Sequence, residues 1–156
     1  MRAVAIILLT AVGALAMRPA LSAEKAGSWT RITETHLIDP NGALQSLDAM
    51  VVAKLLKSTG TTTINYCASE NAPLPTTFQL TPTQTCTMLD PQLEGANFHA
   101  AFACQGETHG RGKMTITYDT AEHYTGESTY SPSEMMSLRW KSTFEGRWTG
   151  PTCASP

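Results

Sequence analysis

The sequence has little charge, few aromatic residues and none of the short motifs that mark common catalytic sites. Charged residues make up only 15% of the chain, and threonine is frequent, which is more typical of sheet proteins than of helical bundles. There is no Gly-x-Ser-x-Gly elbow, no His-Glu-x-x-His pair and no Ser-x-x-Lys in a nucleophile context. We therefore expect a β-rich protein that is not an enzyme, with an enzyme of unrecognised type as the alternative.

Metal and phosphate chemistry also lack a supporting pattern. No Cys-x-x-Cys occurs, which argues against a zinc ribbon and against thioredoxin-like exchange. The glycine-rich stretch over 106–113 has the wrong glycine spacing for a phosphate loop, and Met114 stands where a magnesium-binding hydroxyl is needed. We expect no metal and no cofactor. The histidines are scattered and are interpreted as surface residues: His36, His99, His109 and His123.

The one long hydrophobic run lies at the N-terminus and has the layout of a secretory signal peptide. Arg2 precedes an apolar stretch over 3–16, and small residues close the segment at 20–23. The run is shorter than the roughly 20 apolar residues that a transmembrane helix needs. We expect cleavage after Ser22 or Ala23 and a periplasmic or secreted protein with no membrane span after cleavage. An uncleaved anchor is the alternative.

Loss of residues 1–23 leaves about 133 residues, enough for a single domain over 24–156. The chain has 11 Lys and Arg against 13 Asp and Glu, and the signal carries two arginines and no acid. The mature chain therefore has 9 basic residues against 13 acidic ones, a net charge of −4. That balance argues against nucleic acid or an anionic membrane as a partner.

Hydrophobic spacing predicts one helix among seven short strands. Leu47 to Lys57 carries apolar residues three and four positions apart without glycine or proline, and Ser46 or Asp48 is placed to cap its start. The proline-bearing stretch over 68–85 is expected to be a loop. Short connections between strands predict an antiparallel meander, curved or half-barrel, with the helix packed on it. The expected strands cover residues 29–38, 61–67, 86–89, 97–104, 108–118, 124–130 and 137–148.

Four cysteines in an exported domain indicate two disulfides rather than metal or redox chemistry. A hairpin that turns near residue 95 places Cys86 opposite residues 103–104, which favours Cys86–Cys104 and leaves Cys67–Cys153 to tie the C-terminal tail to the sheet. The competing pairing joins Cys67 to Cys86 and Cys104 to Cys153, and would staple the proline-bearing loop instead.

Short motifs recur in order along the expected domain. They are Gly27-Ser-Trp29 at its start, Cys67 at the end of a strand, Cys86 and Cys104 around a hairpin, Tyr124-Thr-Gly126 in a late strand, and the terminal Trp148-Thr-Gly-Pro-Thr-Cys153. Together they resemble the DUF3617 family of exported bacterial proteins over nearly all of the mature chain. The resemblance implies an exported, disulfide-bonded β-domain with no established activity.

Gly27-Ser-Trp29 also resembles the Gly-x-Trp that opens the first strand of lipocalins. That resemblance implies a closed, ligand-holding barrel in which an arginine stacks on the tryptophan, a part that Arg139 or Arg147 would take. The helix between the first two strands departs from the lipocalin order. An open curved sheet or half-barrel is therefore the favoured form, and the closed barrel is the alternative.

Aromatic residues of the outer strands are the candidate binding surface. Trp29, Trp140, Phe144 and Trp148 form the core if they face inward, and they line an apolar groove if the sheet is open on that side. Our working hypothesis is a binding module of the bacterial envelope that holds a small apolar ligand or a peptide in the curved sheet. The alternative is a module that docks on another envelope protein without a ligand.

Overall fold

The computed structural model describes residues 24–39, 41–69, 77–81, 84–106, 109–135 and 137–153. The signal segment expected over 1–23 lies outside these residues. Within them the chain forms a single antiparallel sheet of eight strands, in the order β2-β1-β8-β7-β6-β5-β4-β3. The strands are β1 (Gly27–Ile38), β2 (Gly60–Ala68), β3 (Thr77–Thr81), β4 (Gln84–Glu94), β5 (Asn97–Gly106), β6 (Gly110–Thr120), β7 (His123–Pro132) and β8 (Arg139–Gly150).

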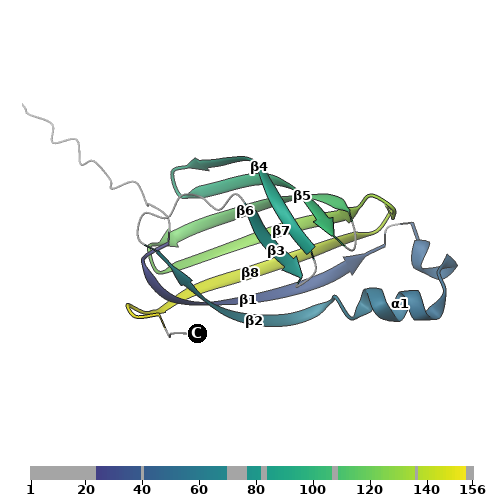
Figure 1. Cartoon of the computed structure of the whole chain (residues 1–156), viewed down its shortest axis with the longest axis horizontal. Helices are drawn as coiled ribbons and strands as arrows, with labels where there is room; N and C mark the ends of the chain where they lie inside the picture. Colours follow the sequence, from purple (N-terminus) through teal and green to yellow (C-terminus); the bar gives the residue numbers. More distant parts are fainter. Residues whose placement is uncertain are drawn as a thin grey trace, which may run out of the picture.

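The sheet curls into an open half-barrel, with β3 and β4 folded over towards the strands at the opposite edge (Figure 1). Strands that follow one another in sequence pair throughout, except β2 and β3, and β1 also pairs with β8. The expected mainly β, antiparallel class is confirmed. The edges β2 and β3 do not pair with one another, so the half-barrel is favoured over the closed barrel.

Two elements differ from the sequence-based expectation. The stretch over 68–85, expected to be loop, contains the edge strand β3, because an edge strand tolerates nearby prolines that a central strand would not. The helix α1 (Ala49–Leu56) begins at the expected cap, where the Asp48 carboxylate accepts from the Met50 backbone N–H at 2.8 Å. It has no buried residue and extends beyond the end of the sheet instead of packing on it (Figure 1).

Strand alternation divides the side chains between a concave and an outer face. The concave face holds two aromatic clusters, one around Trp29, Tyr124 and Phe144 and the other around Phe102 and Tyr130. Aliphatic residues contribute little to either cluster. The core therefore consists mainly of flat rings that lie against the sheet.

Both disulfides have the favoured pairing. Cys86 lies directly opposite Cys104 in the β4–β5 pair, and the bond between them is buried within the second aromatic cluster. Cys67 at the end of β2 is bonded to Cys153 and ties the C-terminal segment to the sheet. The Ser28 hydroxyl supports the same junction by donating to the Thr152 carbonyl at 2.7 Å.

Glycines on the concave face make room for these rings. A Cβ atom added at Gly146 would lie 2.1 Å from Cζ of Tyr124, and one at Gly112 would lie 2.1 Å from Cζ of Phe102. Each ring therefore occupies the space that a side chain on the neighbouring strand would otherwise fill. The same relation holds between Gly126 and the ring of Phe144.

We expect Gly146→Ala to lower the free energy of unfolding by about 1–3 kcal/mol, because the new methyl group overpacks the core against Tyr124. Gly150→Ala is the matched control on the same strand, since a Cβ there meets nothing within 4 Å, and its effect should stay within about 0.5 kcal/mol. Urea denaturation of both variants measures the difference. Equal effects would contradict the proposed close approach.

Candidate functional site

A hydrogen-bonded polar cluster lies on the concave face beside the first aromatic cluster. The Tyr66 hydroxyl donates to Oε1 of Glu24 at 2.8 Å and lies 3.0 Å from the Tyr124 hydroxyl. Tyr66 comes from the edge strand β2, Tyr124 from β7 and Glu24 from the segment before β1. Three separate parts of the chain thus converge on these few polar atoms.

Burial sets the protonation of this cluster. It raises the pKa of Glu24, and the hydrogen bond from Tyr66 and the charge of Arg31 only partly oppose that rise. Burial likewise raises the pKa values of Tyr66, Tyr118 and Tyr124 above the ordinary tyrosine value. The three hydroxyls are therefore neutral at physiological pH and can each donate a hydrogen bond.

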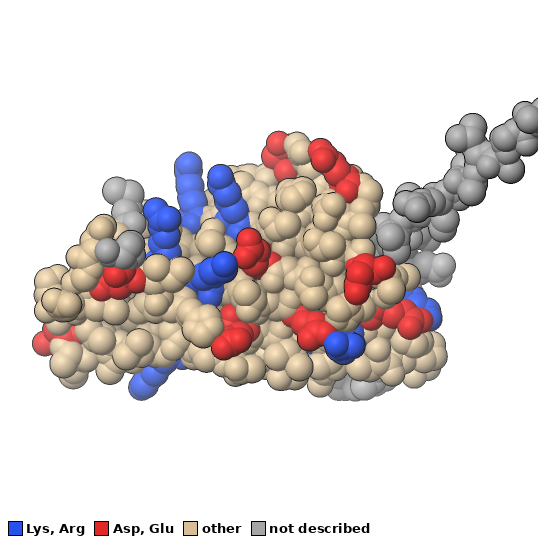
Figure 2. All heavy atoms as spheres, turned by 180° about the vertical axis from the view of Figure 1, so that it is seen from behind, with Lys and Arg blue, Asp and Glu red and all other residues tan. Residues whose placement is uncertain are grey.

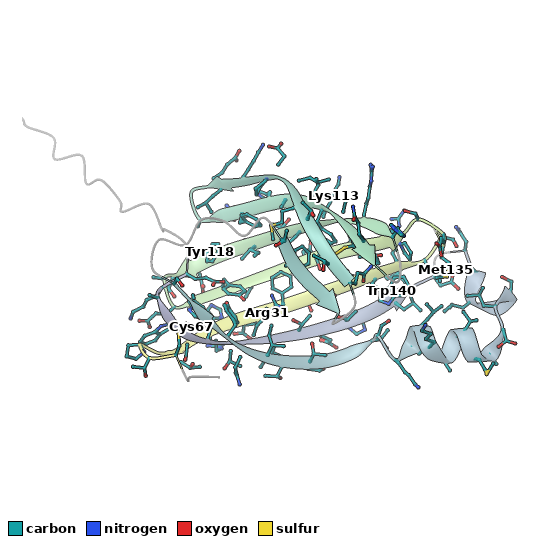
Figure 3. The ribbon with its side chains drawn as sticks, in the orientation of Figure 1. Arg31, Cys67, Lys113, Tyr118, Met135 and Trp140 are labelled. Carbon is teal, nitrogen blue, oxygen red and sulfur yellow. A yellow bond between two sulfur atoms is a disulfide. The ribbon has the colours of Figure 1, made fainter. Side chains whose placement is uncertain are left out.

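Arg31 is the cation of the cluster. It lies on β1 on the same face as Trp29, opposite Gly146 of β8 and Ile64 of β2, and is labelled in Figure 3. The positive charge of its guanidinium and a hydrogen bond to the Tyr124 hydroxyl lower the pKa of Tyr124, which partly offsets the rise that burial causes. Its Nε is buried without a hydrogen-bond acceptor among the described residues. A buried donor without an acceptor is energetically costly, which distinguishes Arg31 from the hydrogen-bonded hydroxyls of Tyr66 and Tyr124.

Small hydroxyl side chains continue the concave face from Arg31 towards the helix end of the sheet. Thr33 and Thr35 are half-buried on β1, Ser142 is half-buried on β8, and Thr62 is exposed on β2. Thr35 and Ser142 share a hydrogen bond of 2.9 Å. We call these four residues the hydroxyl strip. All four side chains are small, so none of them covers the backbone of the strip with a large group.

The four aromatic residues singled out from the sequence all lie on the concave side, but they differ in exposure. Trp29 is fully buried and stacks on Tyr124, with ring centroids 5.6 Å apart, and Phe144 is 8% exposed. Trp140 and Trp148 are half-buried. Trp29 and Phe144 are thus core residues that form the floor of the face, while the other two leave part of each ring at the surface.

The indole N–H groups of the two half-buried tryptophans are both satisfied. Trp140 donates to the Ser58 hydroxyl at 2.8 Å, and Trp148 donates to the Ala26 carbonyl at 3.0 Å. The Lys25 ammonium lies 3.9 Å above the Trp148 ring. These contacts hold the two rings in place at opposite ends of the concave face.

The expected stacking of Arg139 or Arg147 on Trp29 is wrong. Arg139 pairs with Ile38 and Arg147 with Thr30, so both arginines project from the outer face. The arginine that shares the face of Trp29 is Arg31. The two-residue period of a strand places Arg31 on the same face as Trp29, and this signal was present in the sequence.

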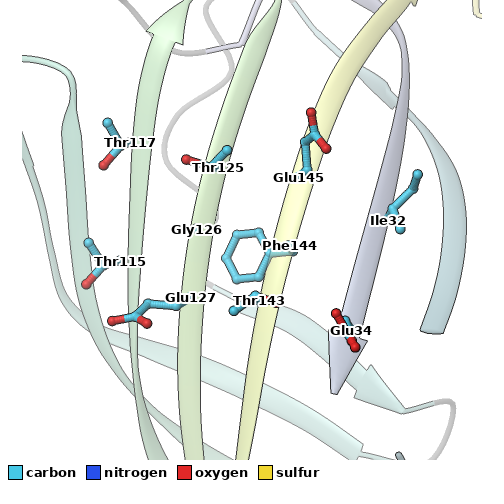
Figure 4. Close-up of a pocket in the computed structure, with 10 residues that line it drawn as sticks. All are labelled: Ile32, Glu34, Thr115, Thr117, Thr125, Gly126, Glu127, Thr143, Phe144 and Glu145. Atoms are coloured by element: carbon cyan, nitrogen blue, oxygen red, sulfur yellow. The ribbon is translucent and has the colours of Figure 1, made fainter. Parts of the chain in front are cut away.

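The outer face carries a separate, shallow groove of about 600 Å³ across β6, β7, β8 and β1 (Figure 4). Threonines and three glutamates line it, namely Glu34, Glu127 and Glu145 together with Thr115, Thr117, Thr125 and Thr143. Figure 2 shows this side of the molecule, with most of the basic side chains gathered on the half nearer to α1. Ile32 and Phe144 also line this open groove, so its surface is mixed rather than wholly polar.

His123 is held between two carboxylates on this outer face. Its Nε2 lies 2.7 Å from Glu145 and its Nδ1 lies 2.7 Å from Asp119, while Arg147 forms an ion pair with the same glutamate. The hydrogen bond to Glu145 is the main reason why the pKa of His123 is raised, and the bond to Asp119 adds to it. The pKa values of both carboxylates are lowered chiefly by their bonds to His123.

This triad predicts a pH-dependent contribution to stability. A histidine with a raised pKa in the folded state contributes fully below its unfolded pKa of about 6.5, and the contribution is lost as pH rises through the folded value. We expect His123→Gln to destabilise the protein more at pH 6 than at pH 9, measured as the free energy of unfolding. If the substitution lowers the free energy of unfolding equally at both pH values, the charged form of His123 does not stabilise the fold.

The fold and these contacts define a disulfide-bonded, curled β-domain with a polar cluster on its concave face. The chain belongs to the family described as "Protein of unknown function (DUF3617)", whose model matches residues 24–153. No curated protein and no solved structure matches the chain. Among the described residues, no three or more His, Cys, Asp or Glu side chains are arranged so that they could hold a metal ion, and no helix is long and apolar enough to cross a membrane.

Proposed function

We propose that the protein is an exported binding module that holds a small, largely apolar ligand on the concave face of its sheet. The observation that carries this proposal is the half-buried Arg31, whose Nε lacks an acceptor, beside an aromatic floor. Ligand sites of this kind combine apolar walls with a few placed polar groups. Arg31 and the hydroxyls of Tyr66 and Tyr124 are such groups on this face.

The contacts on this face describe the ligand that fits. A hydrogen-bond acceptor on the ligand meets the guanidinium of the half-buried Arg31, and an apolar body extends along the hydroxyl strip towards Trp140. The small side chains of Thr33 and Thr35 allow that body to approach the backbone closely. The polar cluster provides orientation, and the half-buried ring of Trp140 supplies apolar contact at the far end of the strip.

We expect Arg31→Met to weaken ligand binding about 10- to 100-fold, because it removes a charged hydrogen-bond donor and keeps the length of the side chain. Arg139→Met, on the outer face, is the matched control and should leave binding unchanged. Native mass spectrometry of protein recovered from its own periplasm measures the bound species, and titration with decanoate, followed by tryptophan fluorescence, measures affinity.

Two results would overturn the ligand proposal. One is a native protein that carries no bound molecule and shows no saturable response to decanoate. The other is equal binding by the Arg31→Met and Arg139→Met variants, which would place the ligand elsewhere.

Export to the periplasm is part of the proposal. The two disulfides suit an oxidising compartment, and the family match begins at residue 24, next to the expected cleavage points. We expect intact mass measurement of the exported protein to give a chain that starts at Ala23 or Glu24. A mass that retains residues 1–22 would contradict cleavage and favour the uncleaved anchor.

A protein-docking role is the second candidate, and the exposed helix α1 favours it. Met50 is 82% exposed, and Val51 and Leu56 are also exposed on this short helix. Apolar side chains of this kind, on an element that covers nothing, are typical of a surface that meets another protein. A native protein without a ligand, whose α1 residues are protected from hydrogen exchange in the periplasm but not after purification, would favour docking over ligand binding.

A further inference from the structure

The edge strand β2 is long, uncharged and unpaired on its outer side. Its nine residues, Gly60–Ala68, pair with β1 on one side only, and no described strand lies beyond it (Figure 1). No backbone hydrogen bond from another described segment reaches its free side. The strand thus presents a row of backbone donors and acceptors ready to pair with another strand.

The usual protections of a sheet edge are missing from β2. Natural edge strands carry lysines or prolines, or are very short or bulged, or lie beneath a helix or loop. β2 contains no charged residue and no proline, and its register with β1 is continuous from Gly60 to Ala68. The helix α1 precedes the strand and lies past the end of the sheet, so it does not cover this edge (Figure 1). The opposite edge, β3, has only five residues.

We propose that β2 pairs in antiparallel fashion with β2 of a second copy, so that one continuous sheet runs through a two-fold dimer. Two identical strands that carry no charge meet without like-charge repulsion, and β2 has no charged residue along its whole length. A two-fold axis requires the same surface on both subunits, which self-pairing of one edge supplies.

The composition of β2 selects a register. Centring the axis on Ile64 pairs all nine residues and places Ile64 opposite Ile64 of the partner subunit. The Ile64 side chain, 41% exposed in the single chain, is then covered by an apolar neighbour. On the outer face the same register sets Thr63 beside Asn65 of the partner subunit, a pair that can form a side-chain hydrogen bond.

The dimer goes beyond the proposed function and does not depend on it. It places two concave faces side by side on the same side of the joined sheet, because residues paired across strands point to the same face. Ligand binding uses side chains of the concave face, whereas pairing uses the free backbone edge of β2, so either can fail while the other stands.

Sedimentation velocity of the mature protein tests the pairing. We expect a dimer for the unsubstituted chain and a monomer for Ile64→Lys, because the substitution sets two ammonium groups opposite each other at the axis. Thr125→Lys, an exposed position on the interior strand β7, is the matched control and should stay dimeric. Circular dichroism confirms that both variants are folded.

Cysteine cross-linking tests the register. Under mild oxidation by diamide, Ile64→Cys should form a covalent dimer, since directly opposed Cβ atoms lie about 4.5–5.5 Å apart. Thr62→Cys should not, because the two copies of that residue are four positions apart along the strands, or roughly 13 Å. A monomeric unsubstituted chain overturns the proposal, and so does a monomer that pairs with an added strand peptide from another protein. A covalent dimer from Thr62→Cys alone overturns the register.

Discussion

The fold depends on the flat packing of aromatic rings over glycines of the concave face. An ordinary sheet surface has a side chain at every second position, and a half-barrel this small has no room for large residues at all of them. Here Tyr124 lies over Gly146 and Phe102 over Gly112, so each ring fills its neighbour's place. This complementarity allows a sheet with few aliphatic residues to curl around a dense core. It also explains why the disulfide between Cys86 and Cys104 is buried in an aromatic cluster rather than exposed at a rim.

The same packing accounts for the position of the polar cluster. Rings that lie flat leave their polar ends at the margin of the core, where the hydroxyls of Tyr66 and Tyr124 meet each other and the Glu24 carboxylate. Gly146 stands between Tyr124 and Arg31 in the cross-strand row and leaves the guanidinium beside the tyrosine. The proposed ligand contacts are thus a by-product of how the core is filled, and so is the uncovered hydroxyl strip beyond them.

Much of the fold could be predicted from the sequence because local signals suffice for hairpins. The turn near residue 95 fixed the opposition of Cys86 and Cys104, and alternation placed Trp140 and Phe144 on one face. The strand β3 could not be predicted, because prolines flank it in the sequence and its pairing is set by tertiary contacts. The position of the helix relative to the sheet could not be predicted, because amphipathic spacing identifies an apolar face but not the element against which that face packs. Glu24 precedes any regular element, so only the three-dimensional structure could bring it to Tyr66.

The involvement of Glu24 has a practical consequence for handling the protein. This residue is the first or second of the expected mature chain, and its carboxylate accepts the hydrogen bond of Tyr66. Any affinity tag or fusion partner joined at that end begins at the margin of the concave face and would compete with whatever lies there. Near the opposite terminus, Cys153 is anchored to the end of β2 by its disulfide. A tag joined at the C-terminus through a flexible spacer should therefore leave the contacts of the polar cluster unchanged.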